Sequence, residues 1–216
     1  MKFYNTLGPN PRLVRMFLAE KGLEIPTEEV DLMAGENRQP AYTQKNPTGQ
    51  MPSLELDDGS VIAETVPICE YLEDTQPEPA LIGSTPQERA ESRMWTRRIE
   101  LNITEPLTNG FRFAEGLSLF KDRVHVIPQA ADDLKAIARE NIEKLDGWLL
   151  GRDYLAGARF SLADIVLYCF LDFATGVGQP VDPALKQVAE WFERVGARPS
   201  AEASVHPVAK AGGMRA

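Results

Sequence analysis

The sequence predicts an α/β domain followed by an all-helical domain, and three observations support this. A strand, a helix and a second strand follow one another between residues 2 and 32. A proline-led hairpin and another helix follow between residues 52 and 73. From Pro86 onwards the apolar residues recur only at helical spacing. The expected order is therefore β-α-β, then β-β-α, then helices alone.

The first strand is expected over residues 2–5, and a loop then leads into a helix. Asn10 suits the cap of this helix, and Pro11 suits its first turn. Lys21 and Gly22 form a typical end, a cation followed by a glycine.

A second strand is expected over residues 28–32, parallel to the first because a helix connects them. An irregular helical segment over 35–44 precedes the hairpin, whose turn is Asp57-Asp58-Gly59. Pro52 cannot donate a ladder hydrogen bond, so it belongs at the start of its strand.

The stretch from Asn46 to Thr65 is the centre of the expected binding site. A proline between a loop and a strand is a candidate for a cis peptide bond, which would turn the backbone of Met51 outward to pair with an extended chain. Glu64 and Thr65 stand where the second hairpin strand meets a helix, and amides at such a junction can hold a carboxylate. The stretch predicts a pocket for a small peptide with a carboxylate.

The second half is expected to hold long helices, one kinked or ended at Pro106 and one over residues 126–150. Ser161 and Asp164 form a capping box before an almost wholly apolar helix, which should be the core of this domain. The predicted segments are an α/β domain over 1–76, a linker over 77–85, a helical domain over 86–200 and a loosely ordered tail over 201–216.

Two motifs in this order resemble those of the cytosolic glutathione transferases. The first is Asn46-Pro47-Thr48-Gly49-Gln50-Met51-Pro52-Ser53 with Glu64-Thr65 after it. The second is Tyr154-Leu155-Ala156-Gly157 followed by Phe160-Ser161-Leu162-Ala163-Asp164-Ile165. The resemblance covers nearly the whole chain and implies a thioredoxin-like first domain. It also implies that Asp164 has a structural role.

By position, the resemblance implies a set of glutathione-binding residues. Met51 would pair with the cysteinyl backbone, and Glu64 and Thr65 would hold the γ-glutamyl end. Asn37 and Arg38 would hold the glycine carboxylate, to which the forked guanidinium of Arg38 is well suited. Thr65 stands where the family usually has serine and keeps its hydroxyl. The full expected set is Asn37, Arg38, Gln50, Met51, Pro52, Glu64 and Thr65.

The position of the family's usual catalytic serine is occupied by Gly8. In this the chain resembles the fungal and bacterial subgroup similar to yeast transferase two, which lacks the usual tyrosine, serine or cysteine. The resemblance implies that the start of the first helix stabilises the glutathione thiolate, through its amides and dipole. Asn10 and Thr6 are the expected hydrogen-bond donors to the thiol. Arg112 is a more distant candidate, because the subgroup carries histidines in that region.

Four apolar residues near Arg112 are expected to form a pocket for a hydrophobic electrophile: Phe111, Phe113, Leu117 and Phe120. A role in the core or in a dimer contact is an equally supported interpretation.

Composition excludes several classes of function. A net charge of −9 argues against nucleic acid or an anionic membrane as the main partner. Cys69 and Cys169 lie in apolar helical patterns and are expected to be buried free thiols. His125 and His206 are the only histidines, so no metal site is expected. No signal peptide or membrane-spanning run is expected, which favours the cytoplasm.

The sequence therefore predicts a homodimeric glutathione transferase that conjugates glutathione, its co-substrate, to small hydrophobic electrophiles, a detoxification reaction. Two alternatives stay open. One is a non-catalytic protein of the same fold that binds glutathione or other ligands, since fold alone does not guarantee activity. The other is glutathione-dependent dehalogenation or ether cleavage. A thiol–disulfide oxidoreductase is disfavoured, since the first helix carries no cysteine at its start.

Overall fold

The computed structural model describes residues 1–211, which form two compact units. The first contains residues 1–84 and 198–211, and the second contains Thr85–Ala197. This division differs from the sequence expectation in one respect, because the end of the chain belongs to the first unit.

A four-stranded mixed sheet forms the centre of the first unit, with strand order β2-β1-β3-β4. β1 pairs with β2 in parallel, and β1 with β3 and β3 with β4 pair antiparallel, which confirms the expected β-α-β and β-β-α order. The strands are β1 (Lys2–Asn5), β2 (Thr27–Glu29), β3 (Ser53–Glu55) and β4 (Val61–Ala63).

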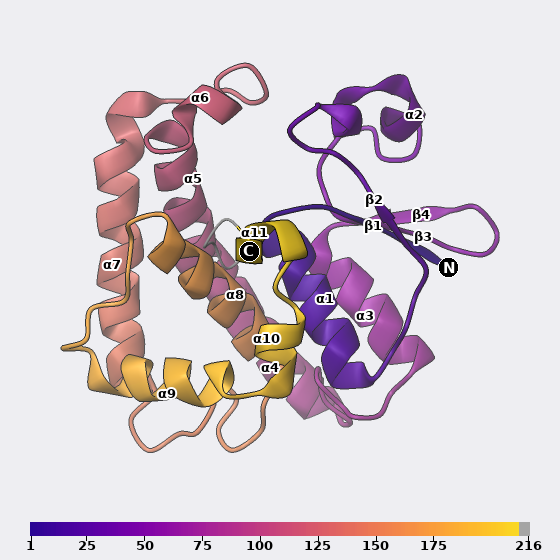
Figure 1. Cartoon of the computed structure of the whole chain (residues 1–216). Coiled ribbons are helices and arrows are strands. Elements are labelled where there is room, and N and C mark those ends of the chain that lie inside the picture. Colours follow the sequence, from indigo (N-terminus) through magenta and orange to yellow (C-terminus); the bar gives the residue numbers. More distant parts are fainter. Residues whose placement is uncertain (212–216) are drawn as a thin grey trace. The chain divides into compact units, whose positions relative to one another are not determined.

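Two long helices pack together on one face of this sheet, α1 (Pro9–Lys21) and α3 (Thr65–Thr75) (Figure 1). A 3-10 turn, η1 (Glu36–Arg38), and the short helix α2 (Pro40–Thr43) lie toward the other face, as expected for the irregular segment between β2 and β3. Phe17 of α1 and Ile68 of α3 are fully buried in the core of this unit.

The chain from Arg198 forms two short helices, α10 (Pro199–Ala203) and α11 (Pro207–Ala211), so the expectation of a loosely ordered tail from residue 201 is wrong up to residue 211. The guanidinium of Arg12 in α1 is fully buried and donates to Ser204 Oγ and to the Ala201 carbonyl. Arg198 also binds the carboxylate of Glu20 through two hydrogen bonds of 2.7 Å. Residues 212–216 lie outside the described part of the chain.

The segment after α3 is held by a buried ion pair between Lys21 and Glu73. The Lys21 ammonium also donates to the carbonyls of Gln76 and Pro79, and the Glu73 carboxylate accepts the N–H of Ile82 at 2.7 Å. This interlocked pair satisfies backbone groups that would otherwise be buried without partners. The expected linker over 77–85 is thus packed onto the first unit as far as Ser84.

The second unit is helical, which confirms the predicted fold class. Thr85 caps its first helix in a capping box with Glu88. The helices are α4 (Pro86–Ile99), the π-helical η2 (Glu100–Thr104), α5 (Glu105–Phe113), α6 (Leu117–Phe120), the 3-10 turn η3 (Pro128–Ala130), α7 (Ala131–Trp148), α8 (Leu162–Gly176) and α9 (Lys186–Gly196).

The expected irregularity at Pro106 takes the form of the π-helical turn η2. Pro106 occupies the second position of α5, where its missing N–H matters least. The π-helical turn directly before it accommodates the change in hydrogen-bond register between α4 and α5.

The predicted core helix α8 is buried along almost its whole length, and Asp164 in its first turn has the structural role expected. The fully buried carboxylate accepts hydrogen bonds from the N–H and hydroxyl of Ser161, the N–H of Leu155 and the indole N–H of Trp191. Burial raises the pKa of Asp164, opposed by these donors. The donors tie the start of α8 to α9 and to the turn before it.

Candidate functional site

Glu64 has the most unusual backbone of the described chain. Its φ of 69° makes it the one residue other than glycine with positive φ among residues 1–211. A ψ of 133° places it outside the left-handed helical region as well, in a conformation that costs about 1–3 kcal/mol. Glu64 is exposed and is the N-cap residue of α3. Strain of this kind concentrates at ligand-binding and catalytic positions.

The N-terminus of α3 is left without a side-chain cap. Pro67, in the first turn, has no N–H, so Thr65 and Val66 supply the first-turn donors at this end. Together with the positive end of the helix dipole, these amides can hold a carboxylate. The half-buried Thr65 adds a hydroxyl at the same point.

The loop over residues 46–50 is fixed by side chains from two other elements. Asn37 of η1, only 3% exposed, donates to the Gly49 carbonyl at 2.7 Å. The Gln50 carbonyl accepts from Tyr42 Oη at 2.9 Å and from Asn46 Nδ2 at 2.8 Å. Asn37, expected to contact the glycine carboxylate, thus uses its side-chain amide to hold the loop. Gln50 keeps an exposed side chain.

Arg38 is exposed and lies against the same loop. Its Nη1 donates to the Thr48 carbonyl at 3.2 Å. A Cβ atom added to Gly49, whose φ is 63°, would lie 2.9 Å from the Asn37 carbonyl and 3.2 Å from Arg38 Nη1. Glycine at position 49 thus permits the arginine to lie flat across the loop, a constraint that sequence reasoning missed.

The Met51–Pro52 peptide bond is cis, as the sequence suggested. Pro52 is buried immediately before β3. Met51 is half-buried and packs against Tyr4, Val30 and Tyr42. Its backbone therefore stands at the end of the fixed 46–50 loop, where the sequence placed it.

The start of α1 differs from the sequence prediction. Gly8, with φ 131°, is the N-cap residue, whereas Asn10 was expected to be. Pro9 and Pro11 lack N–H groups, so Asn10 provides the first-turn amide of α1. No side chain caps this end. Asn10 thus places a backbone donor and a half-buried side-chain amide at the positive end of the helix.

Gly8 is required by its backbone conformation and not by lack of space. A Cβ atom there would have its nearest neighbour, Pro11 Cδ, at 3.8 Å. Thr6 lies two residues before it and is 4% exposed. Its carbonyl accepts a hydrogen bond from Arg15 Nη1 at 3.1 Å. Tyr4 is buried with its hydroxyl 2.6 Å from Glu55 Oε2, so it is a packing residue.

The predicted electrophile-pocket residues lie in the second unit, and the structure brings two of them together. Phe111 contacts Phe120 edge-to-face, with ring centroids 6.1 Å apart. It also contacts Phe173 of α8 at 5.1 Å, a partner that sequence reasoning missed. Phe113 belongs to the buried core, and Leu117 is half-buried at the start of α6. The cavity described below is lined by other residues.

Arg112 lies against this aromatic cluster, with its guanidinium carbon 5.5 Å from the Phe120 ring centre. Nη1 donates to Asn109 Oδ1 at 3.2 Å, whereas Nε is buried without a hydrogen-bond partner among residues 1–211. Burial lowers the pKa of Arg112, and the charge of Glu105 opposes this effect.

Cys69 and Cys169 are buried and form no disulfide, which confirms the expectation. Across residues 1–211 no group of three or more histidine, cysteine, aspartate or glutamate side chains is arranged to hold a metal ion. No helix in this part of the chain is long and apolar enough to cross a membrane.

Two family models match this chain, one in each half of the sequence. The glutathione S-transferase N-terminal domain matches residues 8–75, and the glutathione S-transferase C-terminal domain matches residues 116–199. Glutathione S-transferase 2 of Saccharomyces cerevisiae is 34% identical over 93% of this chain and 87% of its own length. The chain belongs to the glutathione S-transferase family. Its strained Glu64, fixed 46–50 loop and uncapped α1 and α3 are therefore features of a fold whose members use glutathione.

The similarity extends to a solved structure and to a protein named for a different reaction. The crystal structure of Gtt2 from S. cerevisiae superposes with a TM-score of 0.88 at 32% identity, covering 95% of this chain and all of that one. Maleylacetoacetate isomerase of Pseudomonas aeruginosa is 33% identical over 82% of this chain and 83% of its own length. The family likeness thus extends to proteins named for more than one reaction.

Proposed function

We propose that the protein is a glutathione transferase that forms the glutathione thiolate at the start of α1. The observation that carries this proposal is the uncapped α1 terminus, where Asn10 supplies the first-turn amide between two prolines and Gly8 carries no side chain. A thiol can approach such a terminus closely. The positive end of the helix then favours its ionised form.

The γ-glutamyl end of glutathione binds at the start of α3. Its α-carboxylate accepts the N–H groups of Thr65 and Val66 and the hydroxyl of Thr65. Its ammonium pairs with the carboxylate of Glu64, which the strained backbone holds at the junction. The cysteinyl backbone pairs with Met51, in the manner of an added β-strand, and the side chain of Gln50 lines the peptide.

The glycine carboxylate binds the exposed guanidinium of Arg38, a forked donor suited to it. Asn37 acts through the loop by holding the Gly49 carbonyl, so it positions Gln50 and Met51 without touching the peptide. An Arg38 substitution should therefore weaken glutathione binding through the loss of a direct contact.

In the proposed reaction the bound thiol loses its proton to solvent, and Asn10 stabilises the thiolate. Sulfur then attacks the electrophilic carbon of the second substrate, a carbon–sulfur bond forms, and the leaving group departs with its electron pair. Thr6 is a second candidate donor near the start of α1. The product is a glutathione thioether, as expected for detoxification of small electrophiles.

The aromatic cluster of Phe111, Phe120 and Phe173 is the proposed contact for the hydrophobic electrophile, with Phe113 and Leu117 behind it. Arg112 would bind a polar or anionic substituent, because its buried Nε has an unused donor.

We also propose that the protein is a cytoplasmic homodimer. Met94 and Leu101, 40% and 50% exposed on α4 and η2, are apolar side chains that an interface could cover. Two buried cysteines without a disulfide suit a reducing compartment. Light scattering of the purified protein tests the dimer: a monomer at micromolar concentration contradicts it.

Two substitutions at one position test the thiolate proposal. Asn10→Ala removes the side-chain amide and keeps the backbone N–H, whereas Asn10→Pro removes both from a helical turn that tolerates proline. Conjugation of glutathione to an activated aryl halide is followed at neutral pH. We expect at least a tenfold loss of kcat/KM in Asn10→Pro, with glutathione affinity kept within a few-fold. An unchanged rate in Asn10→Pro contradicts the proposal.

A second candidate is a protein that binds glutathione without conjugating it, and Gly8 is the observation that favours it, because no hydroxyl occupies the usual catalytic position. Saturable glutathione binding without thiolate formation and without turnover of any electrophile would support this candidate. Glutathione-dependent isomerisation, dehalogenation or ether cleavage needs the same thiolate, so thiolate formation separates all of these from binding alone.

A further inference from the structure

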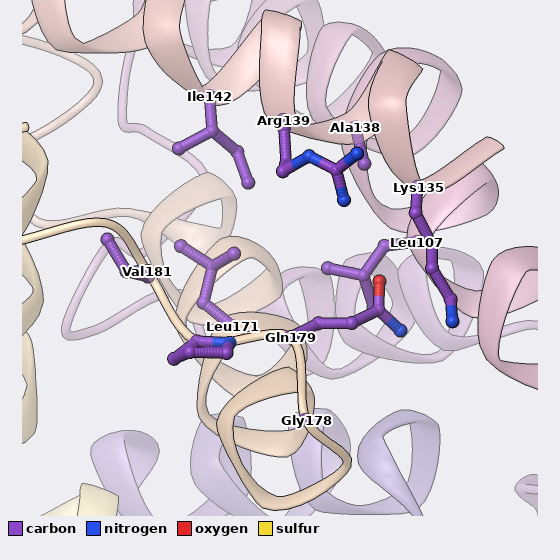
Figure 2. Close-up of a pocket in the computed structure, with 10 residues that line it drawn as sticks. Leu107, Lys135, Ala138, Arg139, Ile142, Leu171, Gly178, Gln179 and Val181 are labelled. Carbon is purple, nitrogen blue, oxygen red and sulfur yellow. The ribbon is translucent and has the colours of Figure 1, made fainter. Parts of the chain in front are cut away.

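A cavity of about 260 Å³ lies within the second unit, between α5, α7, α8 and the loop after α8 (Figure 2). None of its lining residues is among those assigned to glutathione or to the electrophile. Such a volume corresponds to roughly nine water molecules, enough for a ligand of about ten non-hydrogen atoms.

The cavity has an apolar side and a polar side. Ile142, Leu171 and Val181 face it from one side. The guanidinium of Arg139 and the amide of Gln179 lie on the other, with Leu107 beside the amide (Figure 2). A ligand that fills this space without leaving buried groups unpaired must therefore have an apolar body and one polar end.

The polar side has donors that are not satisfied within the protein. Gln179 Nε2 is buried without a hydrogen-bond partner among the described residues. Arg139 is solvent-exposed and has no ion-pair partner in residues 1–211, whereas the nearby Lys135 pairs with Glu115. The polar side thus offers one exposed guanidinium and one buried, unused amide donor, a combination that suits a single carboxylate.

Gln179 is held in place by the end of α8. The N–H of Gln179 donates to the Ala174 carbonyl at 2.8 Å, and that of Val177 donates to the same carbonyl at 3.1 Å. Gly178, with φ 83°, adopts the left-handed backbone conformation that this helix end requires. The donor is therefore presented by a fixed turn, and the cavity is largely formed before any ligand binds.

We propose that this cavity binds a small monocarboxylate with an apolar body, such as a medium-chain fatty acid. The chain lies against Ile142, Leu171 and Val181, and the carboxylate accepts from Arg139 and from Gln179 Nε2. This site shares no residue with the proposed glutathione site, since every residue that lines it belongs to the second unit.

The test is calorimetric titration of the full-length protein with sodium octanoate. We expect saturable binding of one octanoate per chain and at least tenfold weaker binding of 1-octanol, which lacks the charge. Arg139→Gln should weaken octanoate binding at least tenfold, because it removes a charge-assisted contact. Gln179→Leu should weaken it several-fold. Lys144→Ala, an exposed α7 cation away from the cavity, is the matched control and should bind normally.

Ala138→Leu provides an independent check, because Ala138 lines the cavity and a larger side chain there fills it. This variant should lose octanoate binding while its glutathione titration stays unchanged. Absence of saturable octanoate binding to the unmodified protein overturns the proposal. So does binding that survives both Arg139→Gln and Ala138→Leu, or octanol binding as tight as octanoate binding.

Discussion

The strained backbone of Glu64 can be separated from its carboxylate by two substitutions. Glu64→Ala removes the carboxylate and leaves the φ of 69° in place. Glu64→Gly removes the same carboxylate but supplies a residue that adopts positive φ freely. Any difference between the two variants therefore reports the backbone, and any effect that they share reports the side chain.

The stability difference follows from the geometry. A residue in this region costs about 1–3 kcal/mol, which glycine removes. Glycine adds about 0.5–1 kcal/mol of unfolded-state entropy. Glu64→Gly should thus be more stable than Glu64→Ala by roughly 1–2 kcal/mol in urea unfolding. A Glu64→Gly variant that is less stable than Glu64→Ala would refute the assignment of strain.

Both variants should bind glutathione at least tenfold more weakly in calorimetry, since each loses a charge-assisted contact to the γ-glutamyl ammonium. Glu64→Asp shortens the side chain but keeps its charge, and it should retain part of the affinity. If all three variants bound like the unmodified protein, Glu64 would not touch the peptide.

Three further predictions concern stability. Gly8→Ala should lower the free energy of unfolding by about 1–3 kcal/mol in urea titrations, because φ 131° strains any residue with a side chain although space is available. An unchanged free energy would show that the backbone at the start of α1 adjusts to the alanine. Lys21→Met should lower the free energy of unfolding by about 3–5 kcal/mol, because it leaves the Glu73 carboxylate buried without its partner. Adding Glu73→Leu to this variant should recover part of the loss, since it removes the unpaired charge. Additive losses in the double variant would contradict this. Burial acts to raise the pKa of Glu20, but hydrogen bonds from Arg198 and Ser200 outweigh it and lower that pKa. The stability advantage over Glu20→Gln should therefore be full above about pH 4.3 and vanish as the pH falls through the lower folded pKa. An advantage that grows with acid would contradict this sign.

Local signals in the sequence predicted much of the fold. The Asp57-Asp58-Gly59 turn specifies the β3–β4 hairpin, and Gly59 has the required φ of 84°. Ser161 and Asp164 specify the start of α8 through a capping box that needs no distant partner. The candidate Glu64 and the 46–50 loop could be found for the same reason, because each lies in a contiguous motif.

Features that depend on distant contacts escaped prediction. The ordered end of the chain depends on Arg12, whose partners Ala201 and Ser204 lie about 190 residues away and belong to short segments with weak helical signals of their own. The burial of Asn37 follows from its bond to Gly49, which composition cannot show. Asn10 was expected to cap α1 from its residue type, but the backbone of Gly8 lets the helix begin two residues earlier.

The ultraviolet absorbance of bound glutathione across pH tests the central claim most directly. The free thiol ionises with a pKa of about 8.5. If Asn10 and the start of α1 stabilise the thiolate, absorbance of the complex should rise at a pH well below that value, and Asn10→Pro should return the transition toward it. Bound glutathione that ionises at the same pH as free glutathione would contradict the account.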